Sequence, residues 1–224
     1  MQMETPGAKR DRSPFVTLPI MEQKGFVELR RYEGPMPEPT EWEGLDYLDW
    51  KSGGDTNFAI LASANGEHDP RGFWEHGKPD KAGVWTSNID RSPSVKKFVE
   101  SVGADYGRVR IIKLEPNTYE GTIRNLHPDD NNRLTEPGTG WVVRAWLQLT
   151  DNPDSYMIVR EERDDPSTES RIPLPRGAQF VVDSERLWHA VWHDGQKYSE
   201  PRYALIVSFE SGPALDAWIQ SQLP

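Results

Sequence analysis

The second half of the chain is a series of short apolar segments separated by turn residues, and this pattern limits the possible folds more than any other feature. Each segment has five to nine residues and is rich in Val, Ile and aromatic side chains. The eight segments are 108–114, 119–126, 141–149, 155–161, 170–174, 178–184, 187–193 and 202–209. Strands at this spacing are typical of a sandwich or a barrel. We therefore expect a mainly β chain that forms a double-stranded β-helix (jelly roll) with flanking α-helices.

The residues before this series predict supporting strands and one clear helix. Segments 15–21, 25–32 and 57–63 have the composition of short strands. The stretch 92–103 has a capping serine and a proline at its start and a glycine at its end, which is the usual punctuation of a helix. Its apolar side chains fall at helical spacing and form one stripe, so we expect this helix to pack on a sheet.

The length of 224 residues suits one large domain with a substantial core. We expect a single domain over 1–224. Its parts are a loose polar tail (1–14), N-terminal strands with the supporting helix (15–106), the jelly-roll core (107–210) and a C-terminal helix (213–223).

The composition excludes several classes of protein. Cysteine is absent, so disulfide scaffolds and thiolate metal sites are excluded and any metal must bind nitrogen and oxygen ligands. The formal net charge is -10 and no run of Lys and Arg exceeds two residues, so nucleic acid is not an expected partner. No apolar stretch approaches the roughly 20 residues that span a bilayer, and the N-terminus lacks an apolar signal core. We therefore expect a soluble, cytoplasmic protein that does not bind membranes.

The sequence HPD at 127–129 is a candidate half of a metal site. In an extended chain, His127 and Asp129 point to the same side and reach one ion. Two imidazoles and one carboxylate suit an iron(II) centre that must leave positions open for dioxygen. The alternative interpretation of this tripeptide is a polar turn.

A third ligand has to come from one of the four other histidines. His68 and His76 lie in a long polar loop, where solvent exposure is the simpler expectation. His189 and His193 share one face of a predicted strand, but by strand rise they lie roughly 13 Å apart. Only one of these two histidines can therefore complete the site.

The return strand of the same hairpin carries Arg202 at its start. A guanidinium pairs with a carboxylate through two parallel hydrogen bonds, so an arginine here suits a dicarboxylate cosubstrate.

These parts together resemble the iron(II)/2-oxoglutarate-dependent oxygenases, and within them the aspartyl/asparaginyl β-hydroxylase-like branch, which also includes bacterial free-proline hydroxylases. The similarity covers about residues 110–209. It is carried by HPD at 127–129, VVRAWLQL at 142–149 and DSERLWHAVWHDG with PRYALI within 183–206. In that branch a valine-tryptophan pair closely follows the distal histidine, as Val191 and Trp192 do here after His189. The resemblance therefore implies that His189, rather than His193, is the third ligand.

The resemblance implies an enzyme that uses iron(II), 2-oxoglutarate and O2 to hydroxylate an aliphatic carbon. The catalytic metal ligands would be His127, Asp129 and His189, and Arg202 would hold the far carboxylate of 2-oxoglutarate. The branch has a polar, pocket-facing position where this chain has Arg144. That arginine would bind the near carboxylate of the cosubstrate or an acid group of the substrate, unless it faces outward at a sheet edge. Related halogenases lack the carboxylate ligand, so the presence of Asp129 implies hydroxylation.

The expected substrate is a small molecule or peptide that carries a carboxylate, such as an amino acid or a biosynthetic intermediate. Arg124, Arg144 and Arg160 are candidates for a basic substrate pocket, and surface ion pairing is their alternative role. Trp146 stands where the branch often has a histidine, so it is a further candidate substrate contact. The loop 64–85 is either a lid over the site or plain cover for a sheet.

Two other classes of protein remain open. One is a cupin-type metalloenzyme that does not use 2-oxoglutarate, and replacement of Arg202 distinguishes it from the oxygenase. The other is a non-catalytic β-sandwich binding module in which the histidines only pack or form hydrogen bonds, and this class would not bind iron(II).

Overall fold

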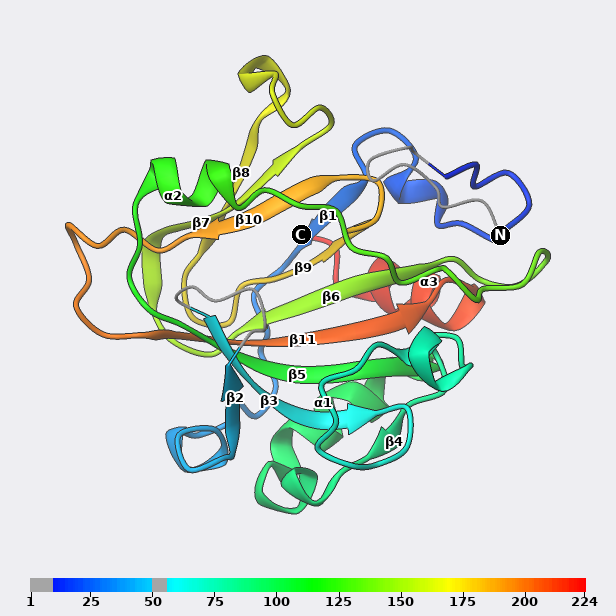
Figure 1. Cartoon of the computed structure of the whole chain (residues 1–224), viewed down its shortest axis with the longest axis horizontal. Helices are drawn as coiled ribbons and strands as arrows, with labels where there is room; N and C mark the ends of the chain where they lie inside the picture. The colour runs from blue at the N-terminus through cyan, green and yellow to red at the C-terminus, as the bar shows by residue number, and fades with distance from the viewer. Residues whose placement is uncertain (1–9, 50–55) are drawn as a thin grey trace.

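The computed structural model describes residues 10–49 and 56–224, and its strands form two antiparallel sheets (Figure 1). The larger sheet has the strand order β1-β9-β6-β11-β5-β3-β2, with β4 paired to β3, and the smaller sheet has the order β10-β7-β8. The strands of the larger sheet are β1 (Phe26–Leu29), β2 (Tyr47–Asp49), β3 (Thr56–Ser63), β4 (Val84–Trp85), β5 (Tyr106–Leu114), β6 (Val142–Gln148), β9 (Gln179–Val182) and β11 (Arg202–Glu210). Those of the smaller sheet are β7 (Asn152–Arg160), β8 (Ser170–Leu174) and β10 (Trp188–Trp192). The expected mainly β architecture is confirmed.

Three α-helices flank the sheets. They are α1 (Pro93–Val102), α2 (Tyr119–Arg124) and α3 (Pro213–Ser221), and the short 3-10 helices are η1 (Pro19–Met21), η2 (Pro39–Glu41), η3 (Phe73–His76), η4 (Ser87–Arg91) and η5 (Pro166–Thr168). In Figure 1, α1 and α3 lie behind the larger sheet, and their apolar faces form one core cluster with it. The expected helices at 92–103 and 213–223 are therefore confirmed.

The centre of the larger sheet is buried on both faces. All seven residues of β6 are buried, and alternation sends Val143, Ala145 and Leu147 to the side covered by the helices. The intervening residues face the smaller sheet, where Trp146 joins a second apolar cluster with Phe180 and residues of β7 and β8. Polar residues on this inner face consequently lie in the space between the two sheets.

The segment 119–126 is expected to be a strand, but its first six residues form the helix α2. Thr118 caps this helix by accepting a hydrogen bond from the backbone N–H of Gly121 at 3.1 Å. The apolar side chains Tyr119, Ile123 and Leu126 fall at near-helical spacing and pack on the outer face of β7 and β10. Packing of this stripe explains why the β-like composition forms a helix here.

The N-terminal expectations hold only in part. Segment 15–21 is not a strand: Val16 makes an isolated bridge to Gly140, and η1 begins at Pro19, which has no N–H to donate to a sheet ladder. The short strands β2 and β4 are additional to the expected ones.

The expected loose tail 1–14 falls partly outside the described residues. Its described part is held in place, because Arg12 donates a hydrogen bond to Asp183 at 2.9 Å. Among the described residues, no helix combines the length and apolarity needed to cross a bilayer.

The layer between the larger sheet and the helices should dominate stability. Leu205 is 0% exposed in this layer, so Leu205→Ala is expected to lower the free energy of unfolding by about 2–5 kcal/mol. The matched control Leu134→Ala removes a side chain that is 39% exposed and should change it by less than about 0.5 kcal/mol. Urea denaturation measures both, and equal effects would contradict the core assignment.

Candidate metal centre

Three side chains from distant parts of the sequence converge in the space between the sheets. His127, Asp129 and His189 each offer one ligand atom, and these atoms lie within 4.8 Å of one another. Over the ranges 10–49 and 56–224, this is the one cluster of at least three such residues. The expected convergence of the three residues is therefore present in the structure.

Backbone hydrogen bonds create this convergence. The N–H of His189 donates to the carbonyl of His127 at 3.0 Å, and the N–H of His127 donates to the carbonyl of His189 at 3.3 Å. The N–H of Asp129 donates to the carbonyl of Ser184 at 2.7 Å. The irregular segment that follows α2 is thereby fixed against β10 and the turn before it.

The two imidazoles present the same nitrogen to the centre. Nδ1 of His127 lies 2.9 Å from the carbonyl of Asn125, and Nδ1 of His189 lies 3.2 Å from the carbonyl of Leu187. A carbonyl only accepts, so each Nδ1 carries the proton and leaves the lone pair on Nε2. Both rings are thus held in the tautomer that binds a metal through Nε2.

The protonation states also suit a divalent cation. Burial lowers the pKa of His189 to about 4, although the nearby Asp129 carboxylate opposes this shift. Burial would raise the pKa of the Asp129 carboxyl, but Arg144, with His189 and His127, holds it well below its usual range. At neutral pH the cluster therefore contains an uncharged His189 and an ionised Asp129 carboxylate. Neither group has to lose a proton before a cation binds.

Arg144 forms an ion pair with the Asp129 carboxylate. Its Nε lies 2.6 Å from Oδ2 of Asp129, and a terminal nitrogen donates to Oδ1 of Asn131 at 2.6 Å. The Nε contact is an ion pair, because the N–H is not aligned with the oxygen as a hydrogen bond requires. Arg144 faces inward and is buried, so it is not an outward arginine at a sheet edge.

Arg202 lies on the same inner face of the larger sheet and is 2% exposed. Its Nε donates to Oε1 of Gln148 at 2.9 Å, and none of the ion pairs within the described part of the chain includes it. Burial lowers the pKa of Arg202 to about 9, so the guanidinium still carries its charge at neutral pH. A buried cation without an anionic partner is unfavourable by itself and is suited to a carboxylate ligand.

Trp146 packs beside the metal ligands instead of projecting into open space. Its ring meets that of His189 edge to face at 6.2 Å between centroids and stacks on Phe180 at 5.4 Å. Trp146 therefore orients His189 and fills the layer between the sheets.

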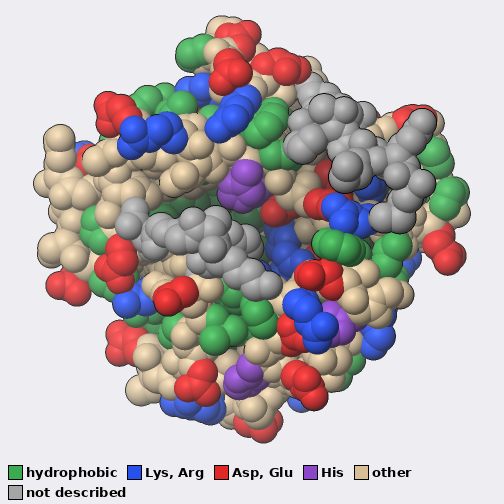
Figure 2. Space-filling model, in the orientation of Figure 1, with side chains coloured by type: hydrophobic (Ala, Val, Ile, Leu, Met, Phe, Trp, Pro, Cys, Tyr) green, Lys and Arg blue, Asp and Glu red, His purple; other side chains and the backbone are tan. Residues whose placement is uncertain are grey.

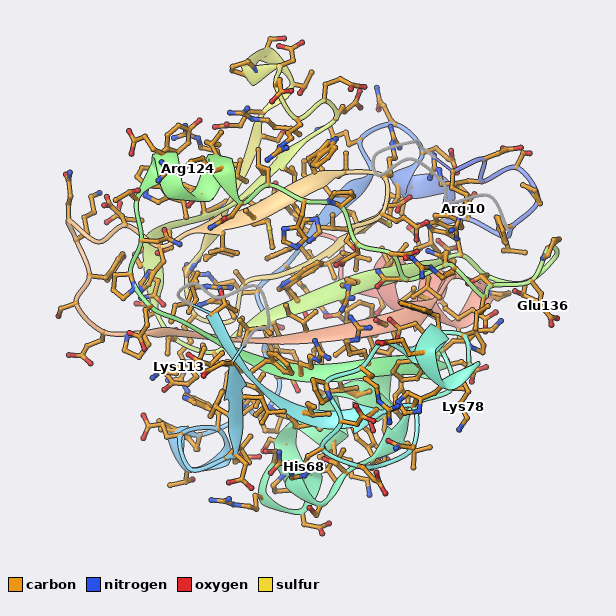
Figure 3. All side chains as sticks on the ribbon, viewed as in Figure 1. Arg10, His68, Lys78, Lys113, Arg124 and Glu136 are labelled. Atoms are coloured by element: carbon orange, nitrogen blue, oxygen red, sulfur yellow. The ribbon has the colours of Figure 1, made fainter. Side chains whose placement is uncertain are left out.

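The other two candidate substrate arginines lie elsewhere. Arg124 is exposed on α2 (Figure 3), and Arg160 lies on the outer face of the smaller sheet, where it pairs with Glu169 at 2.7 Å. The structure does not bring either of them together with Arg144. The strand alternation explains this, because Val159, next to Arg160, is the residue that faces the inner cluster.

The remaining histidines have other partners. His193 is buried between the hydroxyl of Ser155 and the carbonyl of Glu200, at 2.8 and 2.9 Å. His76 pairs with Asp69 at 3.1 Å, and Nε2 of His68 lies 3.3 Å from the Ser87 hydroxyl. The choice of His189 over His193 therefore agrees with the geometry of the cluster.

Two arginines of β5 lie near the metal-ligand candidates. The sequence did not indicate them as site residues. Arg108 and Arg110 share the inner face of the sheet with Arg144, and the charge of Asp129 acts on both. Their spacing of two residues in a predicted strand indicated a common face, but the sequence did not show that this face is buried.

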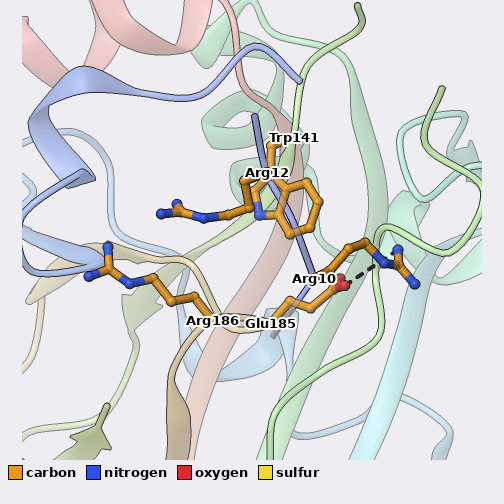
Figure 4. A pocket seen from close by; sticks show the side chains of 5 residues that line it. All are labelled: Arg10, Arg12, Trp141, Glu185 and Arg186. Carbon is orange, nitrogen blue, oxygen red and sulfur yellow. Dashed lines mark ion pairs between the residues drawn. The ribbon is translucent and has the colours of Figure 1, made fainter. Parts of the chain in front are cut away.

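A small cavity lies apart from the metal-ligand candidates. Its volume is about 100 Å³, and it is lined by Arg10, Arg12, Trp141, Glu185 and Arg186 (Figure 4). The Glu185 carboxylate accepts hydrogen bonds from the backbone N–H groups of Asn131 and Asn132, at 3.1 and 2.9 Å. None of the metal-ligand candidates lines this cavity, and Glu185 connects it to the segment that follows Asp129.

Comparison with known proteins supports the fold. No family model and no curated protein matches the sequence. Among solved structures, the chain is similar to a prolyl-4-hydroxylase of Pseudomonas putida, with 12% identity, a TM-score of 0.50, and coverage of 86% of this chain and 96% of that one. It is also similar to the non-heme alpha ketoglutarate dependent carbocyclase SnoK from nogalamycin biosynthesis, with 15% identity, a TM-score of 0.52, and coverage of 94% and 87%. For HygX from Streptomyces hygroscopicus, solved with nickel and 2-oxoglutarate bound, the identity is 11%, the TM-score 0.50 and the coverage 85% and 84%. This likeness confirms the double-stranded β-helix fold.

Loss of one histidine should identify the third ligand directly. His189→Ala is expected to weaken manganese(II) binding by more than about 100-fold, which exceeds the usual effect of losing a residue that only orients a ligand. The control His193→Ala should leave the affinity within about twofold, because its ring nitrogens contact Ser155 and Glu200. Calorimetric titration of anaerobic protein measures both affinities. The reverse pattern would assign the site to His193.

Burial of His189 should also make the metal-free protein less stable in mild acid. Its pKa is about 4 in the folded protein, against an ordinary value of 6.5, so the folded protein resists protonation more than the unfolded chain. The contribution is therefore present above pH 6.5 and is lost as the pH falls toward 4, by on the order of 3 kcal/mol. Urea unfolding with a chelator present measures this slope, and His189→Gln should flatten it. An unchanged slope in this variant would show that His189 is not the responsible group.

Proposed function

We propose that this chain is an iron(II)/2-oxoglutarate-dependent oxygenase of the aspartyl/asparaginyl β-hydroxylase-like branch, which hydroxylates an aliphatic carbon of a small carboxylate-bearing substrate. The observation that carries this proposal is the clustering of His127, Asp129 and His189 at β10 of the smaller sheet, together with a buried Arg202 on the larger sheet of one double-stranded β-helix. Two nitrogens and one oxygen on one side of an ion suit iron(II) and leave the other side for further ligands.

The donor chemistry supports iron(II) in particular. The cluster contains no thiolate, which disfavours a closed structural zinc site, and it has fewer carboxylates than calcium or magnesium sites prefer. HygX was solved with nickel and 2-oxoglutarate bound, and SnoK is described as alpha ketoglutarate dependent, so the same fold holds this cosubstrate in other proteins.

The chain's own residues would position the reactants. Iron(II) with bound 2-oxoglutarate supplies the oxidising power that converts O2 and an aliphatic C–H bond into a hydroxyl group. His127 and His189 hold their Nε2 atoms toward the ion, and Arg144 keeps Asp129 ionised and oriented. Arg202 binds the far carboxylate of the cosubstrate, because its guanidinium has no anionic partner within the described residues.

The apolar residues around the cluster would exclude water. Trp146 and Phe180 stack beside His189, and Ile206 packs against the same cluster from β11. A dry environment strengthens the ion pair between Arg202 and a carboxylate and limits side reactions.

The anaerobic iron(II) protein should develop a weak visible charge-transfer band on addition of 2-oxoglutarate. Arg202→Gln should raise the 2-oxoglutarate concentration needed for this band by at least about 30-fold, because it leaves the far carboxylate without its buried cation. The control Arg171→Gln removes an exposed arginine of the outer face and should leave the titration unchanged.

Other outcomes of this titration identify the alternatives. Iron(II) uptake without a band would indicate a cupin-type metalloenzyme that does not use 2-oxoglutarate. Absence of iron(II) uptake, in the wild type and in Asp129→Ala alike, would indicate a non-catalytic β-sandwich module.

A further inference from the structure

The inner face of the larger sheet carries a group of three arginines beside the metal-ligand cluster. These residues, Arg108 and Arg110 on β5 and Arg144 on β6, are termed the arginine cluster. Ser208 of β11 pairs with Arg144, and Ile206 of the same strand pairs with Arg110. Since neighbouring strands lie about 4.8 Å apart, β5 and β6 are separated by about 10 Å across β11. Side chains as long as arginine meet over this distance.

The arginine cluster is deeply placed. Arg110 and Arg144 are each 5% exposed, and the side chain of Arg108 is 16% exposed. Figure 2 shows a hollow in the middle of this face of the molecule, with basic side chains at its floor and a histidine at its rim. A ligand that enters toward the metal would therefore meet positive charge.

Arg108 is incompletely satisfied by the protein. Its nearest carboxylate, Asp80, lies 3.9 Å away, and its Nε is buried without a hydrogen-bond partner. Asp80 is already occupied, because one oxygen accepts the backbone N–H of Arg108 at 2.8 Å and the other accepts the hydroxyl of Ser208 at 3.0 Å. A buried guanidinium with a long ion pair and a free Nε is costly unless a further anion completes it.

The arginines also repel one another. Burial, followed by the positive charges of Arg108 and Arg144, lowers the pKa of Arg110 well below its ordinary value. Arg110 lies over the ring of Phe58 at 4.1 Å and donates to the carbonyl of Pro70 at 3.2 Å. Iron(II) would add two further positive charges beside Arg144. Repulsion of this kind opposes folding and is found where a site is prepared for a ligand of opposite charge.

The arginine cluster is separate from the residue assigned to the cosubstrate. Arg202 and Ser208 are six residues apart on β11, which corresponds to about 20 Å along the strand. Trp146, which touches His189, pairs with Ile206 between them. An anion on Arg202 and an anion on the arginine cluster would therefore approach the metal from different directions.

We propose that Arg108 and Arg110 form the substrate subsite of this enzyme and bind an acidic group, such as a side-chain carboxylate or a phosphate, of a small amino-acid-like substrate. This inference rests on the proposed function and specifies its substrate class. Because Arg144 pairs with the metal-ligand carboxylate of Asp129 and its charge acts on Arg108 and Arg110, the oxidised carbon would lie only a few bonds from that acidic group. Arg144 acts as a positioning residue between the subsite and Asp129.

The experiment uses the full chain loaded anaerobically with iron(II) and saturating 2-oxoglutarate. The probes are L-aspartate, L-glutamate and O-phospho-L-serine, each compared with its uncharged counterpart, L-asparagine, L-glutamine or L-serine. Calorimetric titration of the wild type should show binding of at least one acidic probe at millimolar concentration and weaker binding of its uncharged counterpart. Absence of binding by all three acidic probes would overturn the proposal.

Arginine variants then locate the binding. Arg108→Gln and Arg110→Gln should each lower the affinity for the acidic probe by at least about tenfold. Arg108→Lys should lower it less, because lysine keeps the charge. The control Arg171→Gln should have no effect. Equal affinity in the wild type and Arg108→Gln would contradict the assignment.

Two further measurements distinguish this proposal from its alternatives. The bound acidic probe should raise the melting temperature of the wild type but not of Arg108→Gln, provided that both unfold in one cooperative transition. The 2-oxoglutarate titration should be unchanged in Arg108→Gln, and a weakened titration there would reassign Arg108 to the cosubstrate. If the wild type shows no 2-oxoglutarate band, the proposed function fails. The same acidic-probe titration on metal-free protein then decides whether the arginine cluster binds anions at all.

Discussion

The backbone bridge between His127 and His189 is the contact on which the candidate site depends. The first histidine follows α2 on an irregular segment, and the second lies on β10, so no single element of secondary structure holds both. Two reciprocal hydrogen bonds fix their relative position, and a third ties Asp129 to Ser184. The side chains of all three ligand candidates converge because these hydrogen bonds fix their backbones relative to one another.

The second constraint is the burial of charge on the inner face of the larger sheet. A sheet that packs helices on one side and another sheet on the other would normally carry apolar residues on both faces. Here the inner face instead carries four arginines, which are Arg108, Arg110, Arg144 and Arg202. Asp80 pairs with Arg108, and Asp129 pairs with Arg144. The apolar cluster around Trp146 and Phe180 remains intact between these charges. The protein thus combines a packed apolar core with buried positive charge in the same layer.

Local sequence patterns predicted the general architecture and the pairing of His127 with Asp129, whereas the preference for His189 over His193 came from the family resemblance. Alternating short segments specify strands, and the His-x-Asp spacing in an extended chain places those two side chains on one face. The strand prediction at 119–126 was wrong, because the composition of this segment does not show that Thr118 caps a helix. Composition also does not show that α2 covers the outer face of the smaller sheet.

The arginines show a different limit of sequence reasoning. Arg124 and Arg160 share only their residue type with Arg144, and α2 and the outer face of β7 place them elsewhere. Arg108 and Arg110 were visible in a predicted strand, but nothing local indicates which face of that strand a second sheet will cover. The sequence also does not show which charged partner each arginine has. Glu169 pairs with Arg160, whereas Arg202 donates a hydrogen bond to the side-chain amide of Gln148.

A crystal structure of the anaerobic protein with iron(II) and 2-oxoglutarate, recorded at the iron absorption edge, is the most direct test of this account. We expect one strong anomalous peak bounded by Nε2 of His127, a carboxylate oxygen of Asp129 and Nε2 of His189, with the far carboxylate of 2-oxoglutarate on Arg202. An iron peak at any other position, or 2-oxoglutarate bound to Arg108 and Arg110 instead, would contradict it.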